Sequence, residues 1–196
     1  MASMTRKRIG AVVLSGGLAA GSLGAGLVFP ASSAAAATTT ASATAAPGAA
    51  VPAWPVLRQG SNSAWPKVTV RSLQYLLRAH GAKVTVDGVF GAKTTAAVVS
   101  FQRAHHLTAD GVVGGTTWSA LIVTVKFGSA GPAVRAVQDQ ANFRNGKSGF
   151  TLGVDGIYGQ LTAVWVAAFQ FVAGLNPDGV AGLRTWQALV TESLAG

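Results

Sequence analysis

Apolar residues recur three and four positions apart in several stretches of the chain, and this spacing is typical of amphipathic helices. One helix is predicted over residues 68–80, where Val70, Leu73 and Leu77 fall on one face. Further helices are predicted over 93–104 and 161–172, around Val134, Val137 and Ala141, and in two short segments that carry Trp118 with Leu121 and Trp186 with Leu189. Residues 84–86 have a strand-like composition but no evident pairing partner, so we expect an extended loop there. The pattern predicts an all-α protein.

The predicted helices belong to two copies of one unit. The matching positions, each 68 residues apart, are Asp87–Gly91 and Asp155–Gly159, Phe101–Gln102 and Phe169–Gln170, and Thr117–Trp118 and Thr185–Trp186. Upstream, Val70–Gln74 matches Val134–Gln138 at an offset of 64, so repeat one is longer before its first helix and repeat two is longer after it. A register held over this length indicates a true repeat. We therefore predict two tandem three-helix bundles, repeat one over 54–122 and repeat two over 123–196.

The motif D-G-x-x-G-x-x-T occurs twice in each repeat, beginning at Asp87, Asp110, Asp155 and Asp178. Asp-Gly is typical of a tight turn, because glycine tolerates positive φ and the Asp carboxylate accepts backbone N–H bonds. The second glycine is predicted to begin the next helix, as its N-cap or just before it, and the Thr hydroxyl to satisfy a free N–H of the first turn. A calcium loop is the alternative, but the alternating carboxylates that it needs are missing.

The beginning of the chain has the order of a secretory signal peptide. Arg6–Arg8 is a short basic run, an apolar Gly- and Ala-rich stretch follows to about Phe29, and residues 31–37 offer small residues for cleavage. We expect a signal peptide over 1–37, with an N-terminal membrane anchor as the alternative. Residues 38–53, rich in Ala, Thr and Pro and without charge, are expected to form a flexible linker. The sequence thus predicts a secreted protein, extracellular or associated with the cell wall.

The 196 residues carry 15 Lys and Arg against 6 Asp and Glu, a formal net charge of +9, and contain no cysteine. Loss of Arg6, Lys7 and Arg8 with the signal peptide leaves 12 cations against 6 acids, and most of this excess falls within 51–122. The charge favours an anionic partner, whereas the dispersed cations and the predicted export argue against nucleic acid. The missing cysteine excludes disulfides, cysteine nucleophiles and thiolate metal sites.

Repeat one carries the run V-D-G-V-F-G-x-x-T-x-x-A-V-x-x-F-Q-x-x-x-x-L-x-x-D-G-V-V-G-x-x-T-W-x-x-L, which begins at Val86. This run resembles the helical peptidoglycan-binding domain found beside cell-wall hydrolases. Repeat two matches it from Val154 to Leu189, with Tyr158 in place of Phe90. The resemblance covers nearly all of residues 57–190. It implies an all-α, three-helix wall-binding module, and no catalytic domain is recognisable beside it.

We expect the first Asp-Gly turn of each repeat to form the ligand-binding edge. An exposed aromatic ring there would stack on a sugar, and the helix N-terminus that follows would attract a stem-peptide carboxylate. The candidate residues are Asp87, Gly88, Phe90, Gly91, Thr94 and Thr95 in repeat one and Asp155, Gly156, Tyr158, Gly159 and Thr162 in repeat two. The alternative for Phe90 and Tyr158 is packing against the bundle. The tryptophans divide into predicted core residues, Trp118 and Trp186, and secondary candidates for ligand contact, Trp54, Trp65 and Trp165.

Catalysis is not expected. His80, His105 and His106 lack the spacing of a metal site and are predicted to be exposed near helix C-termini. Outside the repeated turns the sequence offers only Asp139 and Glu192, both in repeat two, whereas glycoside hydrolysis needs a carboxylate pair. The sequence therefore predicts a non-catalytic protein without cofactor that binds peptidoglycan or another anionic wall polymer through both repeats, without stable membrane insertion. The alternative is an interaction module that recruits or regulates a separate cell-wall hydrolase.

Overall fold

The computed structural model describes residues 53–61, 67–146 and 150–191, and all of them belong to one compact unit. The predicted signal peptide and nearly all of the predicted linker lie outside these ranges, as do Trp65 and Glu192. Within the described ranges, no helix combines the length and the apolar character that crossing a membrane requires.

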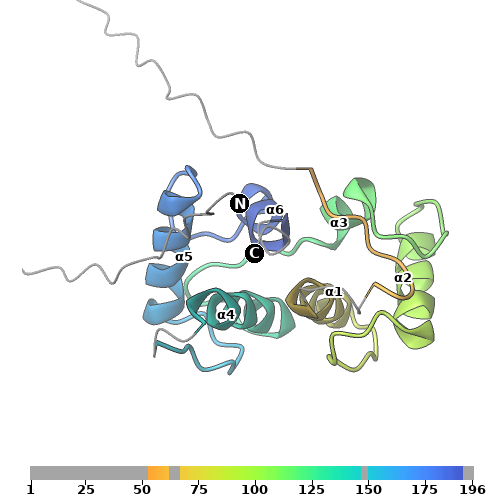
Figure 1. Cartoon of the computed structure of the whole chain (residues 1–196), viewed down its shortest axis with the longest axis horizontal. Helices are drawn as coiled ribbons and strands as arrows, with labels where there is room; N and C mark the ends of the chain where they lie inside the picture. Colours follow the sequence, from red (N-terminus) through yellow and green to blue (C-terminus); the bar gives the residue numbers. More distant parts are fainter. Residues whose placement is uncertain (1–52, 62–66, 147–149, 192–196) are drawn as a thin grey trace, which may run out of the picture. The chain divides into compact units, whose positions relative to one another are not determined.

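Six helices make up the regular structure of the described residues, and the all-α prediction is confirmed. They are α1 (Lys67–Ala79), α2 (Ala92–Ala104), α3 (Gly115–Leu121), α4 (Pro132–Asn145), α5 (Gln160–Val172) and α6 (Leu183–Thr191). Repeat one contains α1 to α3 and repeat two contains α4 to α6 (Figure 1). The predicted helices at 68–80, 93–104 and 161–172 agree with α1, α2 and α5 to within one residue at each end. Residues 84–86 form the expected extended loop.

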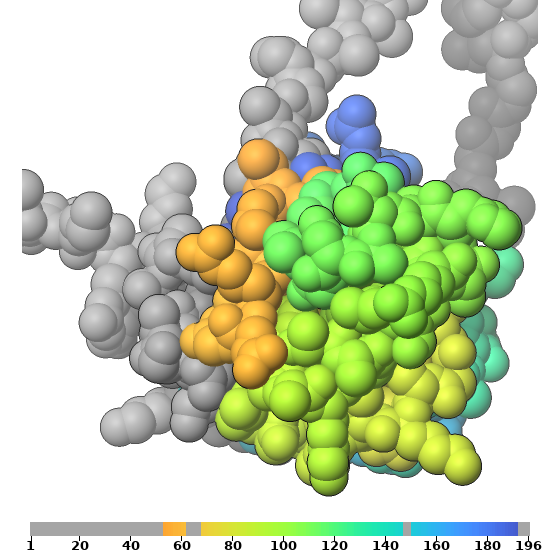
Figure 2. All heavy atoms as spheres, turned by 90° about the vertical axis from the view of Figure 1, so that its right-hand side faces the viewer, coloured from red at the N-terminus to blue at the C-terminus, as the bar shows by residue number. Residues whose placement is uncertain are grey.

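A short extended segment precedes the first helix of each repeat and pairs with the second Asp-Gly turn. In repeat one, the Leu57 N–H donates to the Val113 carbonyl over 3.1 Å, and the Val113 N–H donates back over 2.8 Å. Val125 and Ala181 exchange the same two bonds in repeat two, over 3.3 and 2.8 Å. Figure 2 shows residues 53–61 running along the side of α3 and α2. Leu57 and Val125 are also 68 positions apart. The structural repeat therefore begins before Val70 and Val134, the first positions matched in the sequence.

Each repeat closes around a tryptophan from its third helix. Trp118 and Trp186 are fully buried, as predicted from the sequence. The indole N–H of Trp118 donates to the Pro55 carbonyl over 2.8 Å, and that of Trp186 donates to the Val123 carbonyl over 3.0 Å. Each indole thus fills the core with its ring and ties the extended segment to the bundle with its N–H. The buried side chains of both repeats form one continuous apolar cluster.

The first helices of the two repeats, α1 and α4, pack against each other (Figure 1). Arg71 on α1 forms a two-bonded ion pair with Asp139 on α4, with nitrogen–oxygen distances of 2.6 and 3.0 Å. Tyr75, further along α1, shares a small hollow with Arg135, which lies earlier along α4. The two helices therefore run antiparallel, and equivalent faces of the two repeats meet.

Candidate ligand-binding site

The first Asp-Gly turn is organised by a buried glutamine that the sequence pattern does not single out. The Gln74 amide of α1 donates to Asp87 Oδ1 over 2.7 Å and to the Val89 carbonyl over 3.1 Å, and its oxygen accepts the Gly88 N–H over 2.9 Å. Asp87 Oδ1 also accepts the Val89 N–H over 2.8 Å, which closes the tight turn predicted from the sequence. The Gln74 oxygen also accepts the Asp87 N–H over 3.1 Å, so one side chain satisfies four polar groups of the turn.

A buried glutamine makes matching contacts in each of the other three turns. The pairs are Gln102 with Asp110, Gln138 with Asp155 and Gln170 with Asp178, at Nε2–Oδ1 distances of 3.1, 2.8 and 2.8 Å. The first glycine of every turn has positive φ, as predicted, because the chain reverses there. The second glycine is the N-cap of α2, α3 and α5, which confirms the other half of the turn prediction.

These hydrogen bonds stabilise the ionised form of the turn aspartates. They hold the pKa of Asp87, Asp110 and Asp155 below the ordinary value of 3.8. The largest cause is the Gln74 amide at Asp87, whereas at Asp110 and Asp155 it is the backbone N–H two residues later. The aspartates of the motif are thus structural acceptors.

The threonine of the motif has a different role from the predicted one. Thr94 Oγ1 accepts from Gln74 Nε2 over 3.4 Å and donates to the Val89 carbonyl over 3.3 Å. Thr117 and Thr185 make the same two contacts in the second and fourth turns. The hydroxyl therefore satisfies a carbonyl and the glutamine amide, and the expectation that it caps a free N–H is wrong at these three positions.

The aromatic residues of the predicted binding edge lie inside the bundles. Phe90 is 0% exposed and Tyr158 is 1% exposed, and the Tyr158 hydroxyl donates to the Gly179 carbonyl over 2.8 Å. Burial raises the pKa of the Tyr158 phenol. The prediction that these rings stack on a sugar is therefore wrong, and the alternative of packing against the bundle is confirmed. A signal existed in the sequence, because the same position of the other turns holds the apolar residues Val113 and Ala181.

The other predicted edge residues differ in their exposure to solvent. Gly88, Thr94, Gly156 and Thr162 are buried, Gly91, Thr95 and Gly159 are half-buried, and Asp87 and Asp155 are exposed. Neither α2 nor α5 has a side-chain cap at its N-terminus. Contact between these helix ends and a ligand carboxylate stays a prediction.

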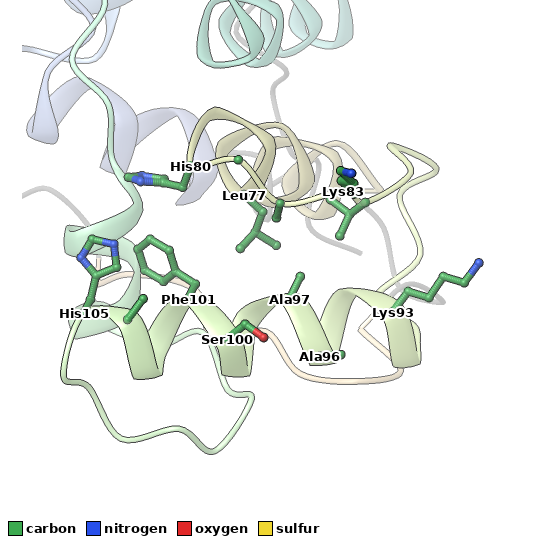
Figure 3. A pocket seen from close by; sticks show the side chains of 13 residues that line it. Leu77, His80, Lys83, Lys93, Ala96, Ala97, Ser100, Phe101 and His105 are labelled. Atoms are coloured by element: carbon green, nitrogen blue, oxygen red, sulfur yellow. The ribbon is translucent and has the colours of Figure 1, made fainter.

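A groove of about 550 Å³ opens in repeat one between the C-terminal end of α1, the loop that follows it and α2 (Figure 3). Its floor is apolar and includes Leu77, Val84, Ala97 and Phe101. The side chain at position 97 is only a methyl group, which leaves the space above it empty. This volume is within the range of small-molecule sites, which is about 300–1,000 Å³.

Three rings meet at one end of the groove (Figure 3). The Phe101 ring centroid lies 4.9 Å from that of His80 and 4.1 Å from that of His105. His80 Nε2 is 3.0 Å from the Leu121 carbonyl oxygen, which can only accept, so this nitrogen carries a proton. The prediction that the histidines are exposed is confirmed. The sequence did not show that two of them converge on one aromatic ring.

Two cations stand at the other end of the groove. Figure 3 shows Lys83 on the loop and Lys93 on α2, across the floor from the three rings, and both side chains are exposed. No acidic residue is among those that line the groove in the described part of the chain. The groove therefore combines an apolar floor, a cluster of rings and a positive end.

Repeat two fills the corresponding space with its own side chains. Trp165 stands where repeat one has Ala97, and its ring stacks on Phe169 at a centroid distance of 5.5 Å and an angle of 7°. Its indole N–H donates to Asn145 Oδ1 over 3.0 Å, and the side chain is 9% exposed. Arg144 stands where repeat one has His80, with its guanidinium carbon 4.9 Å from the Phe169 ring centroid. Trp165, a secondary candidate for ligand contact, is therefore a core residue.

A family model described as a putative peptidoglycan binding domain matches the chain twice, at residues 67–121 and 130–189. The two matches together span more than half of the chain. The chain belongs to this family. Its two peptidoglycan-binding repeats confirm the resemblance seen in the sequence, and each match begins near the first helix of a bundle and ends in the third.

Curated relatives of this chain are longer proteins. A probable N-acetylmuramoyl-L-alanine amidase of Bacillus licheniformis is 32% identical in an alignment 142 residues long that covers 59% of this chain and 40% of the relative. A zinc D-Ala-D-Ala carboxypeptidase of Streptomyces albus G is 40% identical in an alignment 119 residues long that covers 58% of this chain and 45% of the relative. The chain thus spans less than half the length of these relatives. No solved structure gives a significant match.

Proposed function

We propose that this chain is a secreted, non-catalytic protein that binds peptidoglycan. The ligand is supported by the two family matches, which reach all six described helices. It is also supported by the relatives, because N-acetylmuramoyl-L-alanine and D-Ala-D-Ala, the groups in their names, are parts of peptidoglycan. Export is supported by the basic, apolar and small residues of 1–37 in their characteristic order.

The non-catalytic part of the proposal rests on the structural role of the carboxylates. The described residues include five, and each has structural partners: the four turn aspartates bond to glutamine and backbone, and Asp139 pairs with Arg71. Glycoside hydrolysis needs two carboxylates that are free to act on either side of a sugar bond. Among the described residues, no three His, Cys, Asp or Glu side chains are grouped so as to hold a metal ion.

Co-sedimentation with purified, insoluble peptidoglycan tests the binding function. The secreted form is expected to pellet with the wall at low salt and to stay in solution with cellulose, an insoluble glucose polymer that has no peptide. Release of dye from labelled wall should stay at background in the same samples. A chain that stays in solution with peptidoglycan contradicts the binding function, and dye release above background contradicts the non-catalytic part.

A second candidate function, recruitment or regulation of a separate cell-wall hydrolase, is favoured by the outer face of α5. Exposed apolar side chains lie there within one arc of the helix, at Leu161, Val164, Phe171 and Val172, and Phe171 is 75% exposed. The positions that correspond to Leu161 and Phe171 in repeat one hold Lys93 and Arg103. Because the curated relatives are wall hydrolases, a hydrolase of the same wall is the partner that this face would serve.

A variant that copies two residues of repeat one into repeat two tests this second function. Leu161→Lys with Phe171→Arg gives α5 the residues that α2 has at these positions, so it is expected to fold. If the α5 face recruits a hydrolase, the wild type changes the rate at which a purified wall amidase digests peptidoglycan and the variant does not. Equal effects of wild type and variant would remove this candidate.

A further inference from the structure

We propose that the groove of repeat one is the ligand site of this protein, and that its ligand is a peptidoglycan stem peptide with a free carboxylate together with the adjoining N-acetylated sugar. The assignment rests on the proposed function and makes it more specific. It places binding in one repeat and in the space between α1 and α2, away from the Asp-Gly turns.

The charge of the groove selects an anionic ligand. Lys83 and Lys93 stand at one end, and no carboxylate lines the groove in the described ranges to neutralise them. A peptide carboxylate placed there would form charge-assisted hydrogen bonds, which are stronger than neutral ones. The small floor around Ala97 leaves room for short side chains such as those of alanine, which is abundant in stem peptides.

The opposite end of the groove suits a sugar. His105 is exposed, and its ring centroid lies 4.1 Å from that of Phe101. The hydrogen bond to the Leu121 carbonyl holds the His80 ring in place. These rings are held by their own contacts before any ligand arrives, which reduces the entropic cost of binding. A sugar ring or its acetyl methyl group can lie against such a surface.

Repeat two differs from repeat one at described positions that shape this site. Trp165 fills the space above the floor, and Leu161 replaces Lys93. The outer face of α5 is apolar at Leu161 and Phe171, where α2 carries Lys93 and Arg103. We therefore expect one stem-peptide site per chain, in the groove of repeat one. Repeat two instead supports α1, the helix that forms one wall of the groove, through the α1–α4 contact.

Filling the groove with the side chain found in repeat two is the direct test. Ala97→Trp is expected to weaken binding of a soluble disaccharide–pentapeptide fragment of peptidoglycan by about tenfold or more, a loss readily resolved by calorimetry. Ser119→Trp adds the same ring at an exposed position of α3 outside the groove and should bind like the wild type. Unchanged affinity of a folded Ala97→Trp variant would overturn the proposal.

A charge variant tests the same groove independently, in case Ala97→Trp does not fold. Lys83→Glu with Lys93→Glu changes only exposed side chains and should also weaken binding of the fragment by about tenfold or more, because two favourable charges become repulsive. A chito-oligosaccharide, which has N-acetylated sugars but no peptide, should bind more weakly than the fragment and should not respond to the charge change. Equal affinity for both probes, or no effect of the charge variant, would overturn the assignment.

Amide chemical shifts locate the site independently. The fragment is expected to shift signals of residues 80–84 and 93–105 and to leave those of α5 in place. Shifts confined to repeat two, or to the Asp-Gly turns, would overturn the groove assignment while leaving the proposed function intact. Failure of the wild type to bind either insoluble wall or fragment would instead reject the proposed function itself.

Discussion

Arg71 and Asp139 join the two repeats through two hydrogen bonds across the α1–α4 contact. A second polar contact lies beside them, where the buried Gln140 amide donates to Ser72 Oγ over 2.9 Å. These directional contacts favour one register of the two helices. The ion pair therefore connects the two repeats at a partly exposed position of the α1–α4 contact.

The ion pair is expected to stabilise the whole described unit. Asp139→Asn should lower the free energy of unfolding by about 1–2 kcal/mol, because a two-bonded and partly buried guanidinium–carboxylate pair is stronger than an exposed one. Urea unfolding of Asp139→Asn, Arg71→Gln and the double variant gives the coupling energy. Arg103→Gln, at an exposed position of α2, is the control. Additive effects of the two single substitutions would show that the pair contributes nothing.

The glutamine of each turn is expected to be needed for its donor atoms and not for its shape. Gln170→Glu keeps the size of the side chain but removes the N–H groups that bond to Asp178 and the Val180 carbonyl. It should lower the free energy of unfolding by about 2–3 kcal/mol, since buried polar groups lose their partner. Gln160→Glu, at an exposed position of α5, makes the same chemical change without that loss. Equal stability of the two variants would contradict this account of the turns.

Acid should destabilise the protein through the turn aspartates. The pKa of Asp87, Asp110 and Asp155 is lower in the folded chain than the ordinary value of 3.8. The stability that they contribute is therefore present above that value and is lost as the pH falls through the folded pKa. As the pH is lowered from about 5 to 2, the midpoint temperature of thermal unfolding should fall more steeply for the wild type than for a variant with Asn at all three positions. Parallel curves for the two proteins would show that these carboxylates do not control acid stability.

The sequence was sufficient for features that depend on local periodicity and turn chemistry. Helix spacing predicts α1, α2 and α5 to within one residue, and the repeated Asp-Gly motif predicts both the positive-φ glycines and the N-cap glycines. These features are local, because neighbouring residues decide the conformation.

The sequence was insufficient where distant residues share a space. Gln74 reaches a turn 13 residues away, and its role could be inferred only from its recurrence before every turn. The prediction of an exposed ring at Phe90 fails because the residues next to it do not show which way the ring faces, and only comparison with Val113 and Ala181 in the other turns favours the core. The groove escapes prediction because it depends on the small size of Ala97, which is visible only beside Trp165 in the other repeat.

Removal of the buried rings at the turns should destabilise the protein rather than act on the ligand directly. Phe90→Ala is expected to lower the free energy of unfolding by about 3–5 kcal/mol, because the fully buried ring leaves a cavity. Tyr158→Phe removes only the hydroxyl bond to Gly179 and should cost about 1 kcal/mol. Urea unfolding measures both. A Phe90→Ala variant that keeps wild-type stability would show that this ring is not part of the core.

The helix ends at the turns can be tested without disturbing the core. Gln160→Glu places a negative charge in the first turn of α5, where the helix dipole favours it, so stability should rise by about 0.3–1 kcal/mol. The same charge would repel a carboxylate from the free N–H groups of that end. Because the groove of repeat one is assigned as the site, we expect binding of the disaccharide–pentapeptide fragment to be unchanged. A variant that is more stable but binds more weakly would instead place the ligand at the Asp-Gly edge of repeat two. Thermal unfolding and calorimetry on the same sample separate the two outcomes.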